Sequence, residues 1–176
     1  MKKHVITSIV IFFTILSIFP AFIAAKPIRW GPPDEWMVAD SYHLEDGSYY
    51  DGALSDTYSN NGAWLIFTCT YTAVPPEYSN TFEVEFDFSN SNYKKVKLEA
   101  DTDQDGRDGS FYVEAVYTTG DPVRLGTFSP DDVTVYYNLN KNLVLDKIIL
   151  GYLQNDVEGQ RAVFIDEIRA LWTYVP

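Results

Sequence analysis

An acidic loop is the place in this sequence where metal chemistry could occur. Residues 101–109 are Asp-Thr-Asp-Gln-Asp-Gly-Arg-Asp-Gly, so carboxylates recur at alternate positions before a glycine. A hard cation such as Ca²⁺ takes about six to eight oxygen ligands, and carboxylates on a tight turn can converge on one ion. The candidate metal ligands of the loop are Asp101, Asp103, Asp105 and Asp108. The sequence therefore predicts a structural calcium ion here.

The loop could also be an EF-hand or a polar turn without an ion. Asp101, Asp103 and Asp105 with Gly106 match the first half of an EF-hand, but Tyr112 stands where the bidentate Glu is required, and strands flank the loop in place of helices. Asp-Gly also suits a polar turn without an ion. Four carboxylates repel one another without a counter-ion, so we expect an ion-stabilised β-hairpin tip between strands at 95–100 and 111–117.

Aromatic side chains form a second candidate site. All 13 Tyr and all 4 Trp follow residue 25. Sugar recognition combines ring stacking on aromatic faces with hydrogen bonds from polar groups. The candidate ligand-binding residues lie in loops or on less apolar strand faces: Trp36, Tyr49, Tyr50, Tyr112 and Tyr136. Aromatics are favoured in any β-sheet, so part of this set is expected to pack within the sheets.

Catalytic residues are hard to find. His43 is the only histidine after residue 25, and no nucleophile elbow or metal-histidine motif accompanies it. Cys69 is the single cysteine, and its alternation with Leu65, Phe67 and Tyr71 predicts a buried, inert thiol. A glycoside hydrolase needs only two carboxylates, about 5 to 9 Å apart, so a small hydrolase is a third option. We expect no enzyme, because most acids fall on outer strand faces or in loops.

The elements that would position these residues are β-strands. Clean alternation of apolar and polar residues occupies 81–88 and 93–100, and further strands are predicted at 110–118, 123–128, 132–139, 143–153 and 161–175. No stretch of the sequence has apolar residues at the spacing of an amphipathic helix. The pattern predicts an all-β fold, an antiparallel β-sandwich. Residues 89–92 would form a hairpin loop that sets Lys95 and Lys97 beside Glu83, Glu85 and Asp87.

The first 25 residues have the features of a targeting segment. A basic start precedes an apolar run that ends at Ala24-Ala25, as in a secretory signal peptide, although an uncleaved anchor has a similar composition. We expect cleavage, a secreted or cell-surface location, and a single domain over residues 26–176. Loss of Lys2 and Lys3, with no acid in the segment, takes the net charge from −12 to −14. This charge argues against a nucleic-acid partner and against adsorption to an anionic membrane.

The end of the chain resembles a known superfamily. The segments at 145–151 and 163–168 look like the last two strands of galactose-binding-like jelly-roll modules, a group that includes many carbohydrate-binding modules. The segments at 39–42, 47–49, 52–56 and 62–65 resemble the opening of similar modules in secreted and surface proteins. The resemblance implies a jelly roll and a structural Ca²⁺ held partly by an acid of the last strand. Asp166 matches that acid, and Asp40 is a possible partner.

Together these observations predict a secreted, non-catalytic binding module for carbohydrate or a cell-surface polymer, with a structural calcium ion. The alternative is a structural or adhesive extracellular domain that binds protein and has no sugar site. A groove floored by two or three coplanar rings would favour sugar, and a flat apolar patch would favour a protein partner.

The calcium ion can be tested by a calorimetric melt in EDTA and then with added Ca²⁺. Binding to the native state raises its stability, so Ca²⁺ should raise the melting temperature. An unchanged melting temperature would reject a tight calcium site.

Overall fold

The longest strand of the molecule belongs to two sheets. The computed structural model describes residues 34–103, 109–130, 133–155 and 158–175. Within it, β6 (Glu77–Thr102) runs for 26 residues without a Gly or Pro to interrupt the extended backbone. Phe82, Val84 and Phe86 in its first half and Val96 and Leu98 in its second half are all buried. Period-two alternation therefore gives each half one core face.

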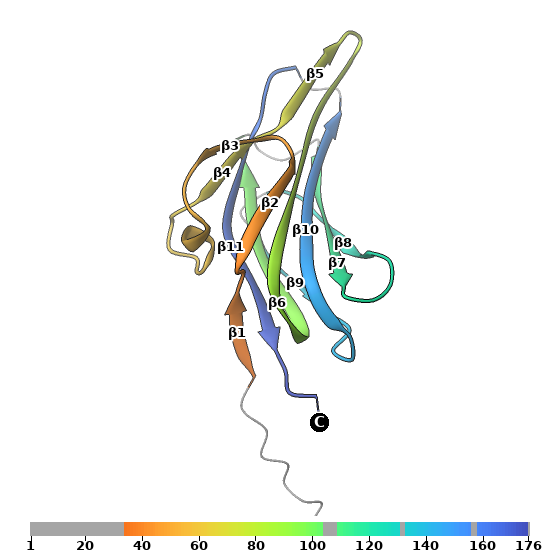
Figure 1. Cartoon of the computed structure of the whole chain (residues 1–176). Coiled ribbons are helices and arrows are strands. Elements are labelled where there is room, and N and C mark those ends of the chain that lie inside the picture. The colour runs from red at the N-terminus through yellow and green to blue at the C-terminus, as the bar shows by residue number, and fades with distance from the viewer. Residues whose placement is uncertain (1–33, 104–108, 131–132, 156–157, 176) are drawn as a thin grey trace, which may run out of the picture. The chain divides into compact units, whose positions relative to one another are not determined.

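The two halves of β6 run in opposite directions but do not pair with each other (Figure 1). The first half pairs antiparallel with β10 (Val144–Asn155), and the second half pairs antiparallel with β11 (Ala162–Trp172). The polar residues Ser89–Asn92 form the corner between them. The prediction of a hairpin here was wrong. The chain reverses direction, but it does so by passing from one sheet to the other.

The corner is fixed by contacts on both of its sides. The Phe88 and Tyr93 rings meet edge to face with centroids 5.8 Å apart, and the Tyr93 hydroxyl donates to the Ser89 carbonyl at 3.1 Å. The Trp172 indole N–H donates to Ser91 Oγ at 2.8 Å. The long-range contacts of the last strand thus hold a corner that the local sequence alone does not distinguish from a turn.

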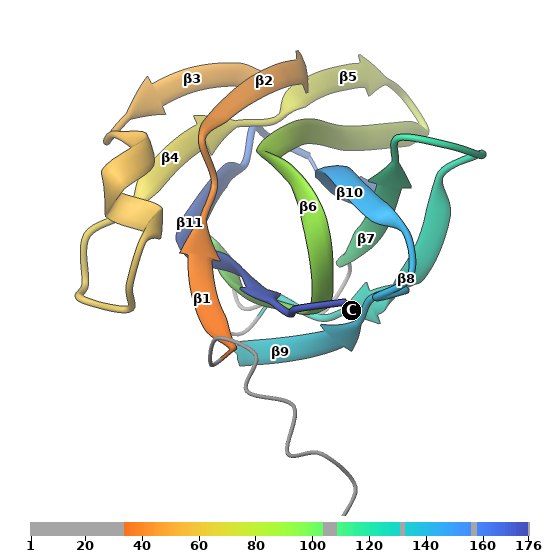
Figure 2. The same cartoon turned by 60° about the horizontal axis from the view of Figure 1, so that its bottom comes forward.

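Both sheets are antiparallel. In sheet A, β11 lies between the second half of β6 and the strands β4 and β1, with β3 and β9 at the edges. In sheet B, the first half of β6 lies between β10 and the strands β2 and β5, and β7 and β8 continue beyond β10. Seen from one end, the strands surround a central space that the core side chains fill (Figure 2). The expected all-β antiparallel sandwich is confirmed.

The remaining elements are short. A 3₁₀-helix, η2 (Leu54–Thr57), links β3 to β4. The other strands are β1 (Glu35–Val38), β2 (Ser41–Asp46), β3 (Ser48–Asp51), β4 (Leu65–Thr68), β5 (Thr70–Val74), β7 (Gly109–Tyr117), β8 (Val123–Phe128) and β9 (Val133–Asn138).

The acidic loop connects the two sheets. β6 ends at Thr102 in sheet A and β7 begins at Gly109 in sheet B, so the expected hairpin tip was also wrong. Cys69 is buried as predicted, with 1% of its surface exposed, and burial raises the pKa of its thiol to about 12. The proposed signal segment and the Met1–Pro32 unit lie outside the described residues. No helix in the described ranges is long and apolar enough to cross a membrane.

Candidate functional site

Three adjoining hollows cross the outer face of sheet B. They lie over β5, β6 and β10, over β10, β7 and β8, and over β2, β6, β10 and β7, with cavity volumes of ≈ 470, ≈ 580 and ≈ 370 Å³. Asn155 lines the first two, and Tyr112 and Leu153 line the last two. Because they share these residues, we treat the hollows as one open groove, called the sheet B groove below.

The lining of the groove mixes hydrogen-bonding groups with a few apolar ones. Leu153 stands near its middle and exposes 46% of its surface. The other lining residues are mainly hydroxyl, amide and carboxylate side chains: Glu45, Asp46, Thr72, Glu77, Ser79, Thr81, Glu83, Ser110, Thr127 and Asn155. Nearly all of them are carried by paired strands, which hold their backbone positions fixed.

Tyr112 is held tightly at the junction of two hollows. Its hydroxyl donates to Glu83, and the Arg124 guanidinium carbon lies 4.1 Å from its ring centroid. A Cβ built on Gly151 would overlap the ring, so the ring lies directly over this glycine. Burial, followed by the hydrogen bond to Glu83, raises the pKa of the Tyr112 phenol well above its usual value. The phenol therefore stays protonated and acts as a donor.

Gly151 explains how a large ring fits over a central strand. It pairs with Tyr112 of β7 on one side and with Glu83 of β6 on the other. The absence of a side chain lets the Tyr112 ring cross β10 and reach Glu83. A glycine inside a strand pattern often marks such a close approach. Tyr112, predicted as a ligand-binding residue, therefore lines the groove with its hydroxyl bound by Glu83 and its ring between Gly151 and Arg124.

Asp46 contributes a second ordered carboxylate to the groove. It accepts hydrogen bonds from Thr70 Oγ1 at 2.5 Å and from the Gly47 backbone N–H at 2.9 Å. The hydrogen bond from Thr70, with a further one from Thr81, lowers the pKa of Asp46. This carboxylate is thus stabilised in its charged form and serves as an acceptor.

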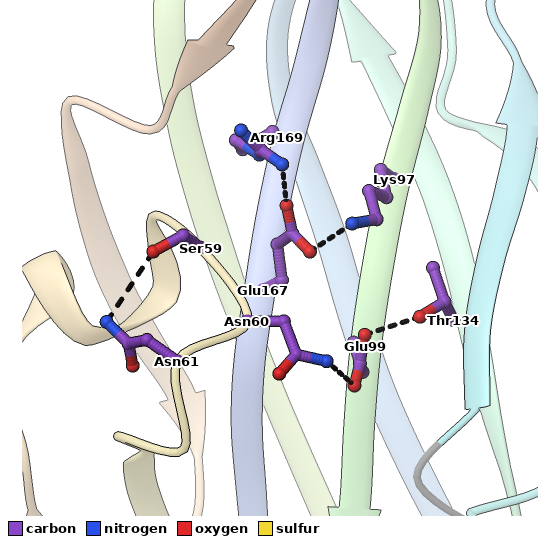
Figure 3. A network of polar contacts seen from close by, with 8 residues as sticks. All are labelled: Ser59, Asn60, Asn61, Lys97, Glu99, Thr134, Glu167 and Arg169. Carbon is purple, nitrogen blue, oxygen red and sulfur yellow. Dashed lines mark hydrogen bonds and ion pairs between the residues drawn. The ribbon is translucent and has the colours of Figure 1, made fainter.

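The outer face of sheet A carries a different constellation (Figure 3). Glu167 of β11 contacts both Lys97 and Arg169, and Glu99 accepts hydrogen bonds from the Asn60 amide and the Thr134 hydroxyl. Glu167 and Glu99 lie directly opposite each other in the strand register and are almost fully buried, at 0% and 3% exposure. Each carboxylate therefore holds two partners from neighbouring positions: Lys97 and Arg169 at Glu167, and Asn60 and Thr134 at Glu99.

Two predicted aromatic residues meet on this face. The Trp36 and Tyr136 rings have centroids 6.3 Å apart, and the Arg169 guanidinium carbon lies 5.9 Å from the Trp36 ring. Tyr136 exposes 57% of its surface. Tyr49 and Tyr50 lie apart from both groups on the edge strand β3, where the Tyr49 hydroxyl donates to the Gly52 carbonyl at 2.7 Å.

The predicted metal ligands are dispersed or fall outside the described residues. Asp101 and Asp103 lie at the end of β6, while Asp40 accepts from Ser89 Oγ at 2.8 Å at the β6 corner. Asp166 is buried in a bulge of β11. Asp105 and Asp108 lie outside the described residues. Among the residues that are described, no three Asp, Glu, His or Cys side chains gather as a metal site. The calcium ion stays a prediction.

Several groove residues were missed from the sequence. In the sequence, Leu153 ends a predicted strand, Asn155 lies beyond that strand, and Arg124 has no feature that indicates a site. Gly151 was the available signal, because a glycine in the middle of an otherwise apolar strand indicates that something large approaches the backbone.

The chain is similar to known proteins only at the level of solved structures. No family model matches the chain, and no curated protein matches it. Solved structures similar to it include carbohydrate-binding modules. A mutant of a family 29 carbohydrate-binding module has a TM-score of 0.40 at 13% identity, over 74% of this chain and 91% of that chain. Another mutant of that family, complexed with cellulohexaose, has a TM-score of 0.40 at 14% identity, over 77% and 93%.

A third structure is the family 32 module of AlyQ in complex with 4,5-unsaturated mannuronic acid, with a TM-score of 0.48 at 10% identity, over 77% of this chain and 97% of that chain. These likenesses come at low sequence identity and are likenesses in fold.

The fit of Tyr112 over Gly151 predicts a specific coupling. Gly151→Ala should lower the free energy of unfolding by about 1–3 kcal/mol, because the new methyl group collides with a ring that neighbouring groups hold in place. In a Tyr112→Ala background the same substitution should cost little. A double-mutant cycle from chemical denaturation measures this coupling, and an equal cost in both backgrounds would show that the ring does not lie over the glycine.

Proposed function

We propose that the chain is a secreted, non-catalytic module that binds carbohydrate along the sheet B groove. The observation that carries this proposal is the continuity of the three hollows across the strands of sheet B. A linear saccharide is an extended ligand with many hydroxyl groups and small apolar patches on its ring faces. An open groove with hydroxyl, amide and carboxylate groups around an exposed Leu153 offers both kinds of contact.

The hydrogen bonds of two groove carboxylates, Asp46 and Glu83, suit binding better than hydrolysis. A glycoside hydrolase needs one carboxyl group that stays protonated as a general acid. Hydrogen bonds from Thr70 and Thr81 instead lower the pKa of Asp46, and Glu83 already accepts the Tyr112 hydroxyl. Both groups are suited to accept hydrogen bonds from sugar hydroxyls.

The similar solved structures suggest the first probes. Family 29 modules have been complexed with mannohexaose and with cellulohexaose. Both are neutral hexasaccharides and so test binding without charge. Secretion, and a structural Ca²⁺ at the acidic loop of residues 101–109, form part of the same proposal. They are supported by the signal-like first 25 residues and by the acidic sequence of the loop.

Isothermal titration calorimetry with mannohexaose and with cellulohexaose tests the function. Wild type should bind at least one of them, and Leu153→Ala and Asn155→Ala should each weaken binding about tenfold, because they remove contacts from the middle of the groove. Tyr50→Ala is the matched control, since this side chain is 69% exposed on the edge strand β3 and does not line the groove.

Equal melting temperatures would show that the variants remain folded. Loss of binding in Tyr50→Ala, with the groove variants unaffected, would place the site at β3 and contradict the proposal. Absence of binding to any saccharide would favour the alternative of a protein-binding adhesive domain.

A further inference from the structure

The outer face of sheet A presents positive charge on an acidic protein. The chain carries a net charge of −12. Lys95 and Lys97 are two residues apart on β6 and so point to the same side of the sheet. Lys97 lies directly opposite Arg169 in the register with β11. The three cations and the rings of Trp36 and Tyr136 are called the sheet A face below.

The two acids nearest these cations are covered, while Asp101, further along the same row of β6, is partly buried. Glu99 and Glu167 are 3% and 0% exposed, so neither can meet a ligand in this conformation. On sheet B the corresponding outward row of β6 consists of Glu83, Glu85 and Asp87, and Glu85 pairs with Lys147 at 2.5 Å. One strand therefore presents an acidic row on one side of the molecule and, on the other, Lys95 and Lys97 followed by Glu99 and Asp101.

Glu167 explains how two cations can lie opposite each other. Like charges directly across a strand pair are destabilising. Glu167 contacts both Lys97 and Arg169, which offsets that repulsion and fixes the two side chains. The three cations Lys95, Lys97 and Arg169 outnumber the two carboxylates Glu99 and Glu167 by one, and Lys95 is the exposed member of the set.

The Trp36 and Tyr136 side chains extend toward each other on the same face as these cations. Trp36 is on β1 and Tyr136 on β9, with β11 and β6 between them. Three strand spacings separate their backbones by about 14 Å. Their centroids are nevertheless only 6.3 Å apart. The two side chains therefore extend toward each other across β11 and β6, the strands that carry Arg169 and Lys97. This places aromatic and cationic groups within reach of one ligand.

We infer that the sheet A face is a second binding site, for a saccharide that bears carboxylate groups. A sugar ring can stack on the exposed face of Tyr136, while its carboxylate pairs with Lys95 and Lys97. This site is separate from the sheet B groove, and its existence does not rest on the function proposed for that groove.

Affinity electrophoresis in gels that contain sodium alginate or polygalacturonate tests the inference. Both polymers should retard the wild-type protein, and retardation should weaken as NaCl is raised, because the exposed charges are screened. Lys95→Glu and Tyr136→Ala should each lower the affinity about tenfold. Lys141→Glu is the matched control, since it makes the same charge change at an exposed lysine outside this face and should leave retardation within about twofold of wild type.

Two further polymers test which chemical group is bound. Dextran sulfate tests whether sulfate esters are bound in place of carboxylates, and galactomannan tests neutral sugars. Retardation by either of these alone, without alginate or polygalacturonate, would overturn the inference. Equal losses in Lys95→Glu and Lys141→Glu would also overturn it, because they would show a general charge effect. Asn155→Ala, in the groove, should retain full retardation by alginate; its loss would assign the anionic ligand to the groove.

Discussion

The structure depends on one long strand that supplies a core face to both sheets. Each half of β6 buries an alternating apolar row, and the two rows face each other across the core. The residues that alternate with the buried ones therefore point outward, on one side of the molecule for the first half of β6 and on the opposite side for the second half. Glu83 borders the sheet B groove, while Lys97 and Glu99 belong to the outer face of sheet A. The corner at Ser89–Asn92 thus fixes the position of both candidate sites.

The strands could be predicted because their signal is local. Period-two alternation located both halves of β6, and the later strands were placed within two residues of most of their observed ends. Strand pairing could not be predicted in the same way. The polar stretch at 89–92 suits a tight hairpin and a corner between sheets equally well. The choice depends on the partners β10 and β11, which follow about 50 to 80 residues later.

Contacts between distant side chains could not be predicted either, because they depend on the strand pairing. Lys97 was expected beside the acids of residues 83–87, since a hairpin would have joined them. Its partner is Glu167, which is 70 residues away in sequence. Trp36 and Tyr136 were selected one by one as exposed aromatics, and only the strand order of sheet A brings them together. Residue type predicted which side chains could bind a ligand, whereas topology decided which of them act together.

The proposed function requires that a saccharide binds in the sheet B groove. Backbone ¹H–¹⁵N chemical-shift mapping during titration with mannohexaose or cellulohexaose, whichever binds, tests it most directly. The account predicts that the largest shifts fall on groove residues of β7, β8 and β10, namely Ser110, Thr127, Leu153 and Asn155. Shifts confined to the edge strand β3 or to the outer face of sheet A, with the groove unchanged, would contradict it.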